Sequence, residues 1–279
     1  MKIATVFWHE KGKTYIEEFM FLKEIGFDGV EVTVSEMNER TPSLSARGYL
    51  RFEVLKDDAK RLLEASKEVS LDIHSVRSGL LWKYSLTASD PNVRRKAINI
   101  VEKELEICSY LGATALLVVP GVVTEDIPYD KAYKISLRAI KELSKKAERE
   151  NVFLCIENVE NNFLLSPLEM RNFVDEIGSE KVGVYLDIGN VLACHQAYPQ
   201  HWISILGKRI KKVHVKDYSI RLKSITYPFQ GSVNWPSVIE ALRKVGYDDY
   251  LTAELTPYKL FPEKFFKDLA ETMKIIIKL

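Results

Sequence analysis

The sequence predicts an α/β fold, a (β/α)8 barrel in which eight parallel strands close into a ring and each is followed by a helix. Eight apolar, strand-like runs alternate with helix-like stretches along the chain. Strands that alternate with helices pair in parallel, because each helix returns the chain to the same edge of the sheet. The alternative is an open doubly wound sheet, but the Gly-rich phosphate loop that follows its first strand is missing after Val6. No linker, repeat or low-complexity segment divides residues 1–279, so we expect one TIM-barrel domain.

Each strand is predicted where a short apolar run is bounded by turn residues. Val and Ile are frequent in these runs, and their branched side chains suit a pleated sheet. Pro120-Gly121 ends the fourth run, and Gly189 follows the sixth. The eight runs are 3–8, 30–34, 71–75, 115–119, 152–157, 182–187, 210–216 and 250–255.

The helices are predicted from apolar residues at helical spacing and from start and stop signals. Gly26 closes the first helix, and Asp90-Pro91 opens the third with an N-cap carboxylate followed by proline at the first helical position. Polar residues that include Pro42, Ser43 and Gly48 predict a loop after the second strand. The helices are expected at 15–25, 55–68, 92–111, 130–148, 166–178, 202–206, 235–246 and 263–278.

The composition excludes several classes of protein. The chain has 40 basic and 39 acidic residues, so no basic surplus points to nucleic acid or to an anionic membrane. No apolar run approaches the ~18 residues of a membrane span, and the N-terminus lacks the features of a secretory signal. Three cysteines, Cys108, Cys155 and Cys194, are too few and of the wrong parity for a disulfide framework. We expect a cytoplasmic protein with reduced thiols.

Acidic residues stand at or near the ends of three of the last four strands, and the fourth carries a histidine. Glu157, Asp187 and Glu254 are the carboxylates, and His214 lies in the alternating segment 212–217. The period of a strand places His214 on the same face as Lys212 and Lys216, opposite two valines. In barrels of this kind the chemistry lies at the C-terminal strand ends, so these four side chains are expected to meet there.

A divalent cation would remove the repulsion among three crowded carboxylates. Oxygen ligands with one imidazole suit Mn²⁺, Mg²⁺, Co²⁺ or Zn²⁺; the hard carboxylates favour Mn²⁺ or Mg²⁺. The absence of cysteine ligands argues against a structural zinc. Taken singly, a strand histidine is more often a core residue, and a strand-end carboxylate is more often a cap or an ion-pair partner. Together, Glu157, Asp187, His214 and Glu254 favour a metal site.

Short strings spread over nearly the whole chain carry a family resemblance. They are GFDGVE at 26–31, SLT at 85–87, DPNVR at 90–94, IEN at 156–158, LDIGN at 186–190, HVKD at 214–217, GSVNW at 231–235 and AE at 253–254. In these strings the chain resembles the xylose isomerase-like barrels. Within them it is most similar to the sugar and sugar-phosphate 3-epimerase/isomerase group, which includes tagatose and allulose 3-epimerases and xylulose-5-phosphate 3-epimerase.

The resemblance implies a ketose epimerase or isomerase with one divalent ion, usually Mn²⁺. The ligands would be the four residues named above, with Asp187 and His214 acting only as metal holders. Such an ion chelates the carbonyl and the neighbouring hydroxyl and stabilises a cis-enediolate. Epimerisation needs proton transfer on both faces of this planar intermediate, and the resemblance assigns that work to Glu157 and Glu254. Members of the group are often homodimers or homotetramers, and the sequence leaves the oligomeric state open.

Two departures from the group point toward its sugar-phosphate branch. Asn190 stands where the free-sugar 3-epimerases have histidine, and Phe163 stands where they have glutamate. Lys216 and Arg221 are therefore candidates to meet a phosphate or carboxylate, although a solvated position suits Arg221 equally well. The remaining candidates for the substrate pocket are Asn190 itself, His74, Glu31 and Trp8, the last of which is equally compatible with core packing.

The sequence also bears on three other functions. Zinc AP endonucleases share the fold but need extra histidines, and the matching positions include Val119-Pro120 and Asn190; balanced charge also argues against DNA. A lyase such as an inosose dehydratase uses the same metal and an enolate, and the sequence does not separate it from an epimerase. A non-catalytic sugar-binding barrel has no need of two opposed glutamates.

Overall fold

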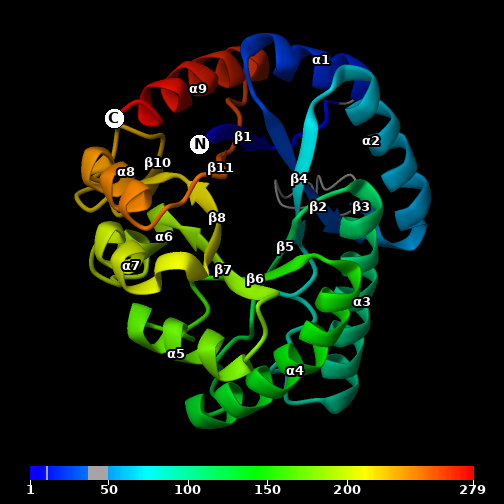
Figure 1. Cartoon of the computed structure of the whole chain (residues 1–279), viewed down its shortest axis with the longest axis vertical. Coiled ribbons are helices and arrows are strands. Elements are labelled where there is room, and N and C mark those ends of the chain that lie inside the picture. Colours follow the sequence, from blue (N-terminus) through cyan, green and yellow to red (C-terminus); the bar gives the residue numbers. More distant parts are fainter. Residues whose placement is uncertain (11, 37–49) are drawn as a thin grey trace.

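Eight parallel strands form a closed ring with helices around it (Figure 1). The computed structural model describes residues 1–10, 12–36 and 50–279, so the predicted loop with Pro42, Ser43 and Gly48 lies outside the described residues. Pairing of β1 with both β11 and β2 closes the ring, which confirms the predicted barrel. Its strands are β1 Lys2–Val6, β2 Gly29–Ser35, β4 Asp72–Ser78, β5 Ala115–Val118, β6 Phe153–Glu157, β7 Val182–Asp187, β8 Ile210–Val215 and β11 Tyr250–Ala253.

The predicted start and stop signals of the helices are present. The Asp90 side chain accepts a hydrogen bond from the backbone N–H of Asn92, and Gly26 takes the left-handed conformation that ends the first helix. The helices within the described ranges are α1 Tyr15–Ile25, α2 Leu55–Val69, α3 Pro91–Leu111, α4 Tyr129–Glu150, α5 Pro167–Ile177, α6 Ile188–Ala193, α7 Pro199–Leu206, α8 Trp235–Lys244 and α9 Pro262–Ile276.

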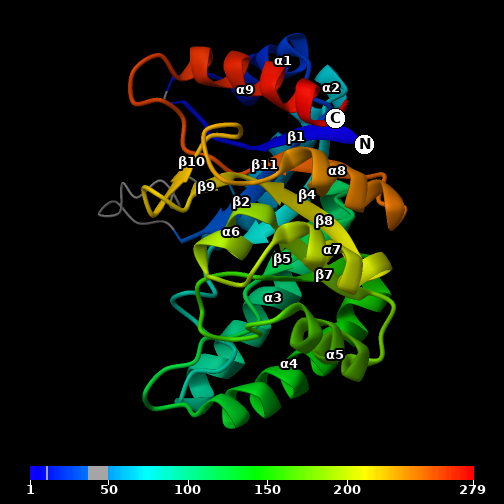
Figure 2. The ribbon, with the colours of Figure 1, turned by 90° about the vertical axis from the view of Figure 1, so that its left-hand side faces the viewer.

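Three short features were not predicted. β3 Leu50–Arg51 pairs with the end of β2, and α6 begins directly after β7, where Gly189 predicts only the end of a strand. β9 Asp217–Ser219 and β10 Ser224–Thr226 form an antiparallel hairpin after β8. In side view this hairpin projects from one end of the barrel, while both chain termini lie at the other end (Figure 2).

The apolar core lies mainly between the ring of strands and the helices. Val213 and Val215 of β8 belong to this core, whereas Lys212 and His214 are buried on the opposite face, inside the ring. The predicted alternation of β8 is therefore confirmed. Polar side chains are also buried inside the ring, among them Glu31, His74 and Thr252.

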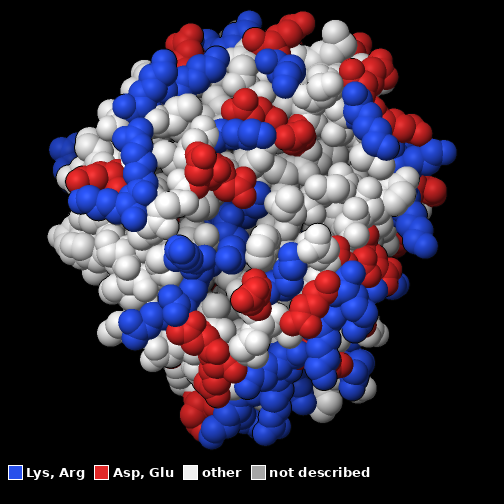
Figure 3. All heavy atoms as spheres, in the orientation of Figure 1, with Lys and Arg blue, Asp and Glu red and all other residues white. Residues whose placement is uncertain are grey.

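Cysteines and surface charge agree with the expectations drawn from composition. Cys108, Cys155 and Cys194 are free. Lys and Arg side chains are interspersed with Asp and Glu over the face shown in Figure 3. Within the described ranges, no helix combines the length and apolarity required to cross a membrane.

Candidate active site

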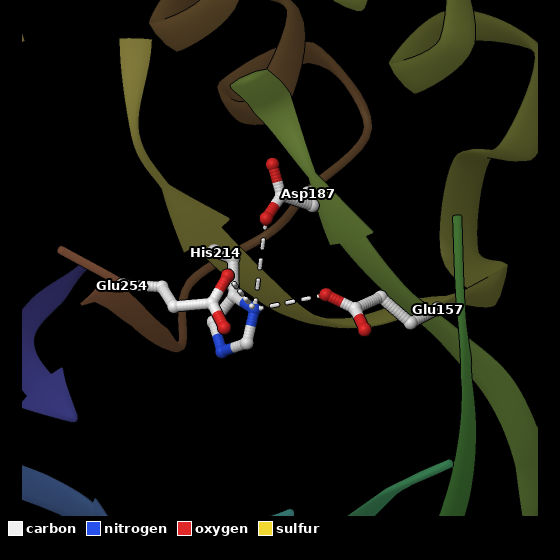
Figure 4. Close-up of side chains that lie close together, drawn as sticks. All are labelled: Glu157, Asp187, His214 and Glu254. Carbon is white, nitrogen blue, oxygen red and sulfur yellow. Dashed lines mark hydrogen bonds and ion pairs between the residues drawn. The ribbon is translucent and has the colours of Figure 1, made fainter. Parts of the chain in front are cut away.

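The four predicted metal ligands meet at the C-terminal ends of four neighbouring strands (Figure 4). Glu157 ends β6, Asp187 ends β7, His214 stands one residue before the end of β8, and Glu254 follows β11. Asp187 is paired with His214 in the parallel ladder, and the N–H of Glu254 bonds to the carbonyl of Val215 at 3.1 Å. One potential ligand atom from each of the four lies within 4.8 Å of the others.

The motif around Asp187 holds one of its oxygens away from the site. Asp187 Oδ1 caps α6 by accepting the N–H of Asn190 at 2.8 Å. The Asn158 amide bonds to both the N–H and the carbonyl of Asp187, at 2.8 and 3.0 Å, and the Asn190 amide donates to the carbonyl of Asn158 at 2.9 Å. These contacts tie the ends of β6 and β7 together and leave Asp187 Oδ2 directed toward the other ligands.

Gly189 is required by the close approach of α6 to the end of β8. A Cβ added at Gly189 would lie 2.5 Å from Lys216 Cγ and 2.9 Å from the Lys216 carbonyl oxygen. Because the second contact is with backbone, any side chain there would push α6 away from β8 and move Asp187 with it. The glycine therefore contributes to the site through backbone spacing.

Lys216 brings a positive charge into the carboxylate cluster. Its Nζ lies 2.6 Å from Glu254 Oε2 and 2.7 Å from Asp187 Oδ2, the latter contact lacking hydrogen-bond geometry. Among the described residues, the fully buried Asp187 Oδ2 thus has the Lys216 ammonium as a close ionic partner and no hydrogen bond of standard geometry. A buried carboxylate oxygen of this kind beside two further carboxylates and an imidazole fits a hard divalent cation.

The electrostatics of the cluster are set by burial and by close charges. Burial raises the pKa of Asp187, and the Lys216 ammonium only partly offsets this. Burial would also raise the pKa of Glu254, but Lys216, His214 and Arg77 outweigh it and hold that pKa well below its usual range. Burial disfavours a charged His214, yet Glu31 and Glu254 dominate and raise its pKa. Without a cation, these carboxylates therefore favour the protonated form of His214.

A cavity of about 690 Å³ opens beside the cluster. Glu157, Lys216 and Glu254 line it, whereas Asp187 and His214 do not. The polar part of its wall also contains Arg77 and Ser78, and the aromatic part contains Trp8, Trp82 and Tyr227. A space of this size with a few convergent charges suits a small polar ligand.

The sequence did not identify Arg77 as a residue of the site. It forms an ion pair with Glu254 and donates to Thr33 Oγ1 at 2.8 Å. The third strand was predicted to end at residue 75, but β4 continues to Ser78, and Arg77 lies on the inner face of that extension. The continued alternation Ser75-Val76-Arg77 was the available signal.

The other predicted substrate residues lie in different places. Trp8 and Lys216 line the cavity. His74 lies inside the barrel, stacked on Tyr250 with 4.2 Å between ring centroids. Asn190 is 6% exposed, and its side-chain amide donates to the backbone carbonyl of Asn158. Arg221 is exposed in the turn between β9 and β10. Only the first two are therefore positioned to contact a ligand in the cavity.

Glu104 of α3 is a buried carboxyl directly behind the cavity wall. Ser78 Oγ donates to its Oε1 at 2.9 Å, and its Oε2 has no partner in the described chain. Burial raises the pKa of Glu104 to about 8. Its pKa in the unfolded chain is lower, so the folded protein binds an extra proton between about pH 4.5 and pH 8, and stability falls as the pH rises through this window.

We expect Glu104→Gln to flatten this pH dependence. The free energy of unfolding should be unchanged below pH 5 and higher by a few kcal/mol at pH 9, since each pKa unit is worth about 1.4 kcal/mol. Urea unfolding of the variant and the wild type across pH 5–9 measures this difference in the free energy of unfolding. Glu102→Gln, a partly exposed position on the same helix, is the matched control. Parallel curves for the Glu104 variant and the wild type would contradict the expectation.

A closed parallel barrel with an acidic and histidine cluster at its C-terminal strand ends defines a class of TIM-barrel proteins with potential metal ligands at that rim. The sequence matches the family described as "Xylose isomerase-like TIM barrel" over residues 19–276, and the chain belongs to this family. The resemblance drawn from the short sequence strings is therefore confirmed.

The similar proteins include sugar epimerases, which are isomerases. The L-ribulose-5-phosphate 3-epimerase UlaE of Shigella flexneri serotype 5b (strain 8401) is 25% identical over 241 residues, 85% of this chain and 80% of the relative. The 3-keto-D-glucoside 4-epimerase YcjR from E. coli covers 100% of both chains at 17% identity, with a TM-score of 0.79. The IOLI protein, solved with a binding zinc atom, is 20% identical with a TM-score of 0.78, over 100% of this chain and 98% of its own.

Proposed function

We propose that this protein is a metal-dependent epimerase that inverts the carbon next to the carbonyl of a ketose or ketose phosphate. One observation carries the assignment. Of the four clustered residues, only Glu157 and Glu254 line the cavity, and they come from strands separated by β7 and β8. Two carboxylates that reach a ligand from different sides are what proton transfer on both faces of a planar carbon requires.

Glu157 and Glu254 would exchange protons with the substrate carbon. One removes the proton on its own face as a carboxylate, and the other delivers a proton to the opposite face; the roles reverse with the direction of reaction. The charges of Lys216 and Arg77 favour the ionised form of Glu254, which is the form a base needs. Trp8, Trp82 and Tyr227 would hold the sugar and limit the access of water.

Glu157, Asp187, His214 and Glu254 would hold the divalent ion. Bound there, it would polarise the ketose carbonyl and acidify the adjacent C–H. The buried Asp187 Oδ2 and the oxygen-rich set support Mn²⁺ as the first choice, with Mg²⁺, Co²⁺ or Zn²⁺ as alternatives. The zinc atom in the structurally similar IOLI protein supports a cation in this fold.

A ketose phosphate is the first substrate class to test. The relative named as an L-ribulose-5-phosphate 3-epimerase supports it, as do Asn190 and Phe163, which replace the histidine and glutamate of the free-sugar enzymes. Lys216 is a cation in the cavity wall that would meet such a ligand, and Trp8 would form part of the wall around it. Because Arg221, His74 and Asn190 do not line the cavity, we assign them no contact with substrate.

Solvent-deuterium exchange tests the proposal. The purified protein is analysed for bound metal and then incubated in D₂O with ketoses, ketose phosphates and an inosose. Deuterium at a single carbon, together with formation of the epimer at that carbon, is the expected result. Loss of water from the inosose without epimer formation would instead identify a lyase. Metal-loaded protein that exchanges no proton into any of these compounds would contradict catalysis and favour a sugar-binding barrel.

A further inference from the structure

A hydrogen-bonded chain of buried side chains lies on the inner side of His214. His214 Nε2 is 2.8 Å from Glu31 Oε1, and Ser75 Oγ donates to Glu31 Oε2 at 2.7 Å. Tyr185 packs against the imidazole, with 4.3 Å between ring centroids, and its hydroxyl is 3.3 Å from Ser75 Oγ. Glu31, Ser75, Tyr185 and His214 are all fully buried.

We propose that Glu31 is the positioning residue that fixes His214 as a ligand through Nδ1. The proposal rests on the proposed function, since it concerns the same cation. Glu31 comes from β2 and His214 from β8, strands that are not neighbours in the ring, so the contact spans the inside of the barrel. Glu31 stands at the nitrogen opposite to the cluster and is not one of the four clustered residues.

The two nitrogens of the His214 ring have different roles. A neutral imidazole carries one N–H, and a carboxylate at Nε2 holds that proton there. The lone pair then lies on Nδ1, which is 3.3 Å from Glu157 Oε1, 3.6 Å from Glu254 Oε2 and 3.8 Å from Asp187 Oδ2. The other tautomer would direct an N–H at the cation and leave Glu31 without its histidine donor.

The charged side chains around His214 also support a role for Glu31 at this ring. Four acidic side chains, Glu31, Glu157, Asp187 and Glu254, surround His214, and the nearby permanent cations are Arg77 and Lys216. Glu31 therefore places a negative charge beside the ring in addition to accepting a hydrogen bond at Nε2.

Glu31→Gln tests the proposal with metal affinity as the readout. Glutamine keeps the shape and can still accept from Nε2, but it lacks the charge. We expect Mn²⁺ and Zn²⁺ to bind about 10- to 100-fold more weakly by calorimetry. Glu18→Gln is the matched control, because Glu18 is also a buried glutamate bonded to a histidine ring, 2.5 Å from His9 Nδ1, but lies outside the cluster. Its metal affinity should equal that of the wild type.

A second readout separates positioning from general packing. In ¹⁵N-edited NMR spectra of the wild-type Zn²⁺ complex, the His214 proton should be on Nε2 with a strongly hydrogen-bonded shift, and Glu31→Gln should weaken that shift. If Glu31→Gln fails to fold, Ser75→Ala decides, because it removes only the hydroxyl that donates to Glu31 and should weaken affinity a few-fold.

The possible failures are distinguishable. A proton on Nδ1, or unchanged affinity in folded Glu31→Gln or Ser75→Ala, would overturn the positioning role and leave the metal site standing. A wild-type protein that binds none of the divalent ions would overturn the proposed function as well.

Discussion

Glu254→Gln should lower the rate of epimerisation by about 10³-fold, within the 10²- to 10⁴-fold range typical of a lost acid/base group. The amide has nearly the same shape as the carboxylate but cannot accept a proton from carbon. Glu254 lines the cavity and lies 2.6 Å from Lys216 Nζ, so the loss affects a group placed to contact the substrate. The measurement is kcat at saturating metal.

The exchange pattern of the variant provides a sharper test. Glu157 would still remove and return a proton on its own face, so deuterium should enter one epimer from D₂O without conversion to the other. Glu157→Gln should show the opposite preference. Glu160→Gln, an exposed position on the same loop as Glu157, should behave as the wild type. Conversion at an undiminished rate in metal-loaded Glu254→Gln would remove this glutamate from the mechanism.

Removal of the divalent ion by a chelator should abolish turnover and lower the midpoint of thermal unfolding. The physical reason is that Glu157, Asp187 and Glu254 are packed together, and a bound cation removes their repulsion. Ligand binding at 100 times the Kd stabilises a folded protein by about 2.7 kcal/mol. Calorimetric scans with chelator and after addition of Mn²⁺ measure the effect.

The affinity for the divalent ion should also depend on pH. Because the surrounding carboxylates raise the pKa of His214, a proton competes with the cation for this side chain, and metal affinity should weaken as the pH falls. Asp187→Asn should lose the metal-induced gain in thermal stability, whereas Glu160→Gln should retain it. A thermal midpoint that is identical with chelator and with Mn²⁺ would contradict a metal site.

Much of the barrel could be predicted because its signals are local. Asp90-Pro91 starts α3 and Gly26 ends α1 through contacts within one helical turn. The alternation through 210–216 assigned Val213 and His214 to opposite faces. The hairpin of β9 and β10 escaped prediction, and so did the extension of β4 to Ser78.

The sequence by itself determined which four residues would meet, because parallel strands in a closed ring bring their C-terminal ends together whatever the intervening loops are. Only the tertiary structure decided which atoms face one another. Arg77 forms an ion pair with Glu254, and Glu31 contacts His214 across the inside of the barrel. The Asn190 amide binds the backbone carbonyl of Asn158 instead of lining the cavity. Such contacts join strands that are distant along the chain, and their partners are set by register and curvature, which no local pattern encodes.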